Sequence, residues 1–126
     1  MKKLAGVFFL LILNAHLVAD DGRNFDGTAL REECRLLDSN PNSHQSGMCL
    51  GFVNGVHAGH LVIHEWSKME PFYCAPDGLS HKQVALIVVK FMDEHPELLD
   101  INAESIVLCS LASAFPCPVE PVKPKK

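Results

Sequence analysis

The chain has 126 residues, of which 48% are hydrophobic and 21% are charged, and its formal net charge is −4. This length accommodates a single domain, and the hydrophobic fraction is too high for an intrinsically disordered chain. The negative charge argues against sequence-independent binding of nucleic acid. No long apolar run follows the N-terminal segment, which excludes a protein that spans a membrane several times.

Residues 1–19 have the order of a secretory signal peptide. The positively charged Lys2 and Lys3 precede an almost wholly apolar stretch, residues 4–13, and the small residue Ala19 stands where cleavage is expected. The apolar stretch is too short to serve as a stable membrane anchor. We therefore expect an exported chain without membrane contact after cleavage.

Five cysteines lie in the part that would be exported: Cys34, Cys49, Cys74, Cys109 and Cys117. In an oxidising compartment, disulfide bonds are the default state of such residues. Because the number is odd, one thiol stays free or pairs with a second chain.

The first predicted helix begins at residues 26–28, and it places Leu30, Cys34 and Leu37 on one face. Residues 38–46 are rich in Asn, Ser and other turn-forming residues, which predicts a loop.

Residues 47 to about 68 contain no proline and are predicted to form one long helix. Glycine recurs at every fourth position of this helix, as Gly47, Gly51, Gly55 and Gly59. Each glycine costs about 1 kcal/mol of helix propensity relative to alanine, so the stripe indicates that another backbone packs unusually close. Two interpretations are open: a seam between two copies of the chain, or packing against a helix of the same chain.

Residues 69–77 contain two prolines and are predicted to form a connection, with Phe72 and Tyr73 folded back onto the core. Ser80 and Gln83 have the spacing of a capping box. The apolar residues that follow recur at i, i+3, i+4 and i+7, which predicts an amphipathic helix.

Pro96 is expected to end this helix, and Asn102 is expected to cap a last helix that ends before Pro116. The prediction is an all-α fold, a small four-helix-type bundle over residues 20–118, followed by a tail rich in Pro and Lys, residues 119–126.

Three histidines of the long helix, His57, His60 and His64, stand at i, i+3 and i+7. Such residues can bind zinc or copper. However, the glutamate of the HExxH motif is missing, and spacing alone is a weak motif. We expect a polar helix face and no metal or cofactor.

No pattern predicts catalysis. Cys109 is expected on the apolar face of the last helix, and neither it nor Cys74 has the neighbours that activate a thiol. The paired acids Glu32 and Glu33 are typical of a solvated helix end rather than of an acid–base pair. We therefore expect no catalytic residue.

An acidic turn is the better candidate for function, because it can meet a basic partner. Its residues are Asp93, Glu94, His95, Glu97 and Asp100.

Several blocks of the sequence occur in the order of a known family. Residues 49–55 (CLGFVNG) resemble the Cys-Leu-Gly-aromatic-x-x-Gly signature of the Rap/Tai family, the immunity proteins against type VI secretion amidase effectors. The resemblance continues through residues 74–78 (CAPDG) and 90–97 (KFMDEHPE) and closes on residues 114–117 (AFPC). It covers about residues 26–117.

The resemblance implies a small helical protein of the periplasm that often forms dimers and has no chemistry of its own. Such a protein binds a peptidoglycan-cleaving Cys–His amidase and blocks its active-site groove with a protruding loop and a helix face. The resemblance also implies two disulfides, Cys34–Cys49 and Cys74–Cys117, and leaves Cys109 as the free thiol.

We therefore expect an immunity protein that occludes an amidase and protects its own cell from intoxication, with a homodimer through the glycine stripe as one of the two open interpretations of that stripe. The alternative is a small disulfide-stapled stress protein or chaperone of the periplasm, which would respond to acid through His57, His60 and His64. A metal-binding protein is the remaining alternative.

Overall fold

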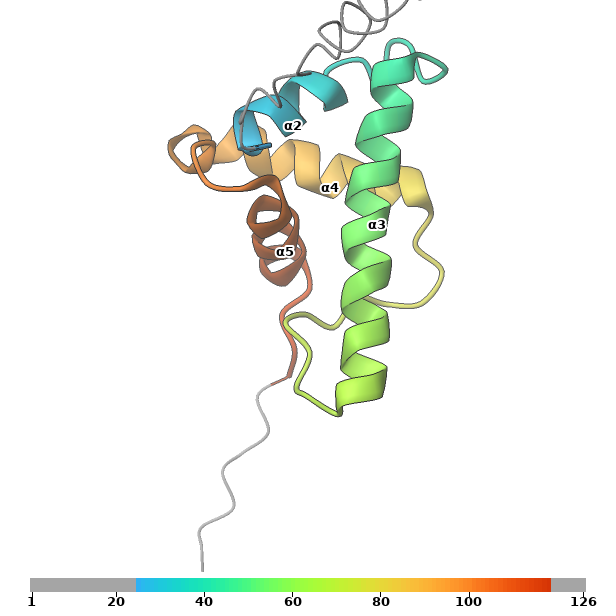
Figure 1. The fold of residues 1–126 in the computed structure, drawn as a ribbon, viewed down its shortest axis with the longest axis vertical. Coiled ribbons are helices and arrows are strands. Elements are labelled where there is room, and N and C mark those ends of the chain that lie inside the picture. Colours follow the sequence, from blue (N-terminus) through green and yellow to red (C-terminus); the bar gives the residue numbers. More distant parts are fainter. Residues whose placement is uncertain (1–24, 119–126) are drawn as a thin grey trace, which may run out of the picture.

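Four α-helices follow one another in the computed structural model, which describes residues 25–118 (Figure 1). They are α2 (Gly27–Cys34), α3 (His44–Ser67), α4 (His81–Glu94) and α5 (Ala103–Ala114), with a short 3₁₀ helix, η1 (Pro96–Leu98), before the last. The described residues contain no β-strand. The predicted all-α fold is confirmed, whereas the predicted signal peptide and Pro/Lys tail lie outside the described residues.

Each helix begins at a polar side chain that accepts a hydrogen bond from a backbone N–H of the first turn. Asp26, Ser80 and Asn102 play this role for α2, α4 and α5, and Ser80 forms the predicted capping box with Gln83. The start of α3 differs from the prediction. Ser43 caps it, so the helix begins at His44, inside the segment that was predicted to be a loop.

The core takes buried side chains from all four α-helices and from the α3–α4 connection. Its members are Leu30, Cys34, Leu37, Cys49, Val53, Tyr73, Val84, Ala85, Val88, Met92, Ala103, Ile106, Val107 and Leu111. Tyr73 folds onto the core as predicted, but Phe72 does not: it is 69% exposed.

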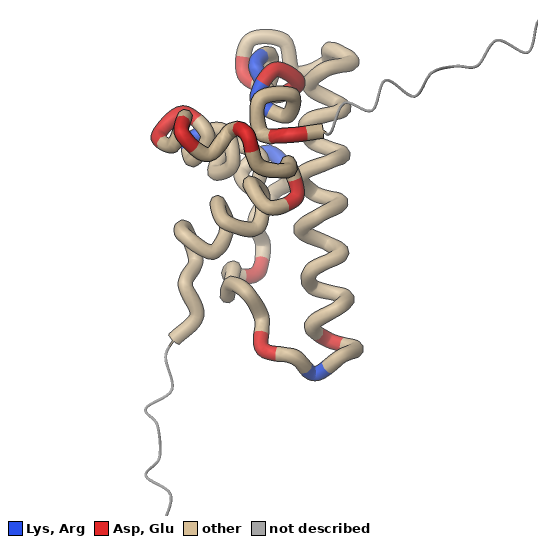
Figure 2. Tube along the Cα trace, turned by 60° about the vertical axis from the view of Figure 1, so that its left-hand side comes forward, with Lys and Arg blue, Asp and Glu red and all other residues tan. Residues whose placement is uncertain are grey.

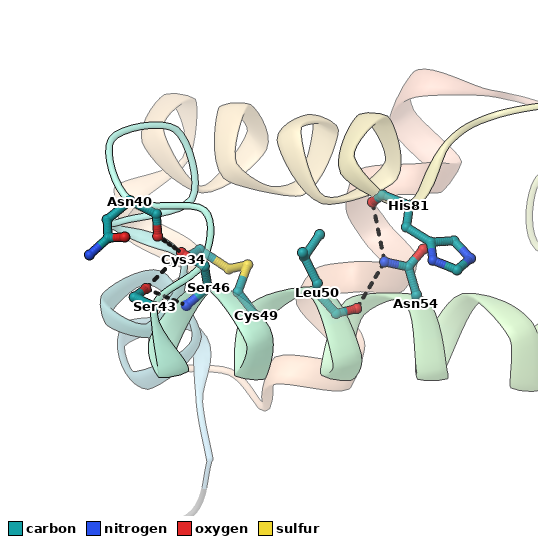
Figure 3. Close-up of a disulfide and its surroundings, with 8 residues drawn as sticks. All are labelled: Cys34, Asn40, Ser43, Ser46, Cys49, Leu50, Asn54 and His81. Carbon is teal, nitrogen blue, oxygen red and sulfur yellow. Dashed lines mark hydrogen bonds between the residues drawn. A yellow bond between two sulfur atoms is a disulfide. The ribbon is translucent and has the colours of Figure 1, made fainter.

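Two disulfides fix this arrangement, Cys34–Cys49 and Cys74–Cys117, as the family resemblance implied. The first joins the end of α2 to the first turns of α3, beside the hydroxyl of Ser46, which donates to the carbonyl of Asn40 over 2.8 Å (Figure 3). The second ties the α3–α4 connection to the segment after α5.

Cys109 has a free thiol, as expected, but its position differs from the prediction. It is exposed instead of facing the core, because α5 buries a different set of residues, Ile106, Val107, Ser110 and Leu111.

α3 is the longest helix, and its second half extends beyond the rest of the bundle (Figure 1). Its three buried residues, Ser46, Cys49 and Val53, all lie in the first half. The side-chain amide of Asn54 joins α3 to the first residue of α4, since it donates to the carbonyl of His81 over 3.2 Å (Figure 3). Among the helices of residues 25–118, none is both long and apolar enough to cross a membrane.

Candidate partner-binding surface

The four glycines of α3 lie on its exposed face. A Cβ built at Gly47, Gly51, Gly55 or Gly59 meets no atom within 4 Å. One of the two interpretations of the stripe was packing against another helix of the same chain. The structure of residues 25–118 does not show such packing. Within the described chain this face has no partner.

Helical periodicity extends the glycine face with larger apolar residues, Met48 toward the start of α3 and Val62 and Trp66 toward its end, all of them exposed. Glu65 is the one acidic or basic residue of the whole helix, histidines aside. We call the surface formed by the four glycines with Met48 and Val62 the glycine face. It is long and almost uncharged.

A second apolar surface lies where α3 ends and the connection to α4 begins. We call its four exposed residues, Ile63, Trp66, Met69 and Phe72, the apolar end. Trp66 is 82% exposed, the highest value among the large apolar residues. A hollow of about 280 Å³ adjoins the apolar end, with Leu108 of α5 in its wall. Large apolar side chains gathered on a surface are typical of a protein-binding site.

Three histidines hold the connection against α3 beside this hollow. His57 Nδ1 lies 2.7 Å from the hydroxyl oxygen of Tyr73, and the His60 ring stacks on the Tyr73 ring at a centroid distance of 4.3 Å. His64 Nδ1 contacts the carbonyl of Met69. These histidines thus act as contacts within the fold, and no group of three or more His, Cys, Asp or Glu side chains among residues 25–118 is placed to hold a metal ion.

Burial changes the acid–base properties of this cluster. It is the main reason why the pKa values of His57 and His60 lie below the usual value of 6.5, and neighbouring histidines lower them further. Burial also raises the pKa of Tyr73 to about 12. At neutral pH, burial therefore favours the uncharged forms of His57, His60 and Tyr73.

The acidic turn lies at the opposite end of the bundle, at the end of α4 and around η1. Figure 2 shows that acidic residues gather in this region, whereas the far half of α3 carries few charges. The structure brings the five predicted residues of the turn to the surface, four of them exposed and His95 half-buried.

Part of the charge of the turn is already balanced by nearby cations. Asp93 pairs with Arg31 of α2 at 3.0 Å, and Glu94 pairs with Lys90 at 3.7 Å. His95 Nδ1 lies 3.1 Å from a carboxylate oxygen of Glu97. Exposed pairs of this kind contribute little to stability, so a basic partner can exchange with them at small cost.

The apolar end was not predicted from the sequence, although a signal for it exists. Leu61, Val62, Ile63 and Trp66 point to different sides of a helix, and one core cannot cover them all. A helix that is apolar all round must either be fully buried or find a partner. Because α3 is longer than its neighbours, residues 25–118 leave most of its second half exposed.

Comparison with known proteins gives one match. The family model of the Rap1a immunity proteins matches residues 26–117, a segment that contains all four helices and both disulfides. No curated protein and no solved structure matches the chain significantly.

Proposed function

The chain belongs to the Rap1a immunity protein family, and we propose that its target is a peptidoglycan amidase delivered by type VI secretion, whose active-site groove it blocks. The observation that carries the proposal is the family match over residues 26–117, nearly the whole described chain. The protein works in the periplasm, to which a signal peptide at residues 1–19 would direct it. The two disulfides agree with such an oxidising compartment.

Occlusion of an enzyme requires a surface that is already rigid, because ordering a loop on binding costs affinity. Two features of the fold supply rigidity near the apolar end. Cys74–Cys117 fixes the connection covalently, and the backbone N–H of Cys74 donates to the carbonyl of Phe115 over 2.8 Å. The three histidine contacts described above hold the same connection along α3.

The apolar end is the part of the molecule best suited to enter a groove. It projects from the bundle (Figure 1), and its aromatic residues Trp66 and Phe72 are free to bury large areas against a partner. We propose that the apolar end is the protruding element that the family resemblance implies. The acidic turn, at the opposite end of the bundle (Figure 1), is the alternative contact, suited to a partner with basic residues.

The experiment is co-production of the exported chain with a candidate type VI peptidoglycan amidase, in cells that the amidase alone kills. We expect growth to be restored and the two purified proteins to bind. The double substitution Trp66→Ala with Phe72→Ala should weaken binding by about 30-fold or more, which is the size of a hot-spot loss. Leu61→Ala, which changes an exposed apolar residue of α3 outside both the apolar end and the glycine face, is the matched control and should bind normally.

The outcomes test the assigned target and the proposed contact surface separately. If the chain neither binds the amidase nor restores growth, the assigned target is wrong. If it protects the cells and the double variant protects equally well, the apolar end is not the contact, and charge reversal in the acidic turn becomes the next test.

A further inference from the structure

We propose that His57, His60 and His64 form a clasp, which fixes the α3–α4 connection on α3 at neutral pH, and that charging of His60 loosens this clasp in acid. We call these three residues the histidine clasp. The proposal concerns how the connection is held, and it does not depend on which partner the protein binds.

After the end of α3, the connection to α4 runs back along the same helix. The three histidines lie on one side of the helix, one on each successive turn, and each meets a different part of the connection. His64 contacts the carbonyl of Met69, His60 packs against the rings of Phe72 and Tyr73, and His57 reaches the hydroxyl of Tyr73.

The three contacts respond differently to a proton. A carbonyl only accepts hydrogen bonds, so His64 already donates from Nδ1 and can keep this contact when charged. A tyrosine hydroxyl can donate or accept, so the contact of His57 with Tyr73 survives when His57 is charged, with Nδ1–H donating to the hydroxyl oxygen. His60 is the exception, because its Nε2 is buried and has no hydrogen-bond partner among the described residues.

Charging His60 therefore places an imidazolium N–H where nothing accepts it, which disfavours the closed connection. Other titratable groups facing the clasp are Glu70, Tyr73 and Asp77 of the connection and His81 at the start of α4. α5 contributes only the apolar Leu108 to the hollow. Glu70 is exposed, so solvent screens its charge.

The direction of the effect follows from the lowered pKa of His60. At a pH between the ordinary pKa of 6.5 and the lower pKa of His60 in the closed state, His60 binds a proton when the connection is open but not when it is closed. The contribution of the clasp is fully present above about pH 6.5 and is lost as the pH falls to the lowered pKa. The open fraction rises by at most about tenfold per pH unit for each such histidine.

Tyr73 allows a direct test, because it is the one tyrosine in the chain. In the full exported protein with labelled tyrosine, NMR signals of the ring and their broadening by a soluble paramagnetic agent report how exposed Tyr73 is. We expect exposure to rise severalfold between about pH 7.5 and about pH 5, while the circular dichroism of the helices stays constant.

His60→Phe keeps an aromatic ring but cannot be charged, so it should remove this pH dependence. His44→Gln, a substitution of an exposed histidine at the start of α3, should keep it. Constant exposure of Tyr73 in the unchanged protein overturns the proposal, and so does an equal pH dependence in His60→Phe. A loss of helical signal in parallel with the exposure overturns it as well, since that result means global unfolding. Should His60→Phe fail to fold, His60→Gln takes its place in the same comparison.

Discussion

At the scale of single residues, the glycines of this chain have very different surroundings. Gly27, in the first turn of α2, is buried, and a Cβ there would lie 3.0 Å from both the Cα of Leu99 and the Cγ1 of Ile106. Its N–H donates to the carbonyl of Ile101 over 3.0 Å. Gly55 in α3 is open on all sides. One glycine lets two backbones approach, and the other has no such role within the chain.

We predict opposite effects of alanine at these two positions. Gly27→Ala should destabilise the fold by about 1–3 kcal/mol, because a backbone atom of Leu99 must move to admit the new methyl group. Gly55→Ala should stabilise the isolated monomer by about 0.5–1 kcal/mol, the gain in helix propensity. Denaturant unfolding at low protein concentration measures both. A neutral Gly27→Ala would contradict the close approach of α2 to the segment before α5.

At the scale of elements, we propose that the glycine face of α3 is a seam between two copies of the chain, which is the other interpretation of the stripe; the family resemblance implies dimers in general. The face has no partner within the described chain, and it carries almost no charge. Two such helices can approach closely because glycine has no side chain to keep their backbones apart.

We predict that Gly55→Leu prevents dimer formation without unfolding the monomer, since the added side chain points into open space within one chain. Analytical ultracentrifugation should show the unchanged protein as a dimer and the variant as a monomer with the same circular dichroism. Ile63→Leu changes an exposed apolar residue outside the face and should leave the dimer intact. If the unchanged protein and the variant are both monomers, the glycine face is not a seam between two copies.

The helices themselves were predictable because their signals are local. Asp26, Ser80 and Asn102 cap their helices in the way their positions predict, and Pro96 stands just beyond the end of α4. The apolar period of α4 also identifies its buried face. Such signals depend on neighbours within one or two helical turns, which the sequence displays directly.

The surfaces were less predictable, since exposure depends on which elements cover a residue. The sequence pairs Phe72 with Tyr73 as core residues, yet only Tyr73 reaches the core. From the sequence alone, the glycines at every fourth position, beginning with Gly47, are compatible with close packing and with an open face. What decides both cases is the length of α3 relative to its neighbours, which is a property of the assembled fold.

At the scale of the whole molecule, the two disulfides have different tasks. Cys34–Cys49 closes a short stretch of chain, with a separation of 15 residues, between two helices that also share the core. Cys74–Cys117 has a separation of 43 residues and joins two segments outside the helices, the α3–α4 connection and the end of the described chain. In the chain-entropy model their contributions to the free energy of unfolding are about 3 and about 4 kcal/mol.

We predict that replacing both cysteines of a pair by serine has different effects for the two pairs: both variants lose stability, but only one loses the ability to protect cells. Without Cys34–Cys49 the midpoint of denaturant unfolding should fall, but the folded fraction should still protect cells, because the connection stays tied down. Without Cys74–Cys117 the fall should be similar or larger, and protection should be lost even at temperatures where circular dichroism shows native helix content. This difference follows because the connection carries Met69 and Phe72 of the apolar end. Growth with the co-produced amidase, measured beside the unfolding midpoint, checks both variants. Equal protection by the two variants at equal folded fraction would contradict the role given to the second disulfide.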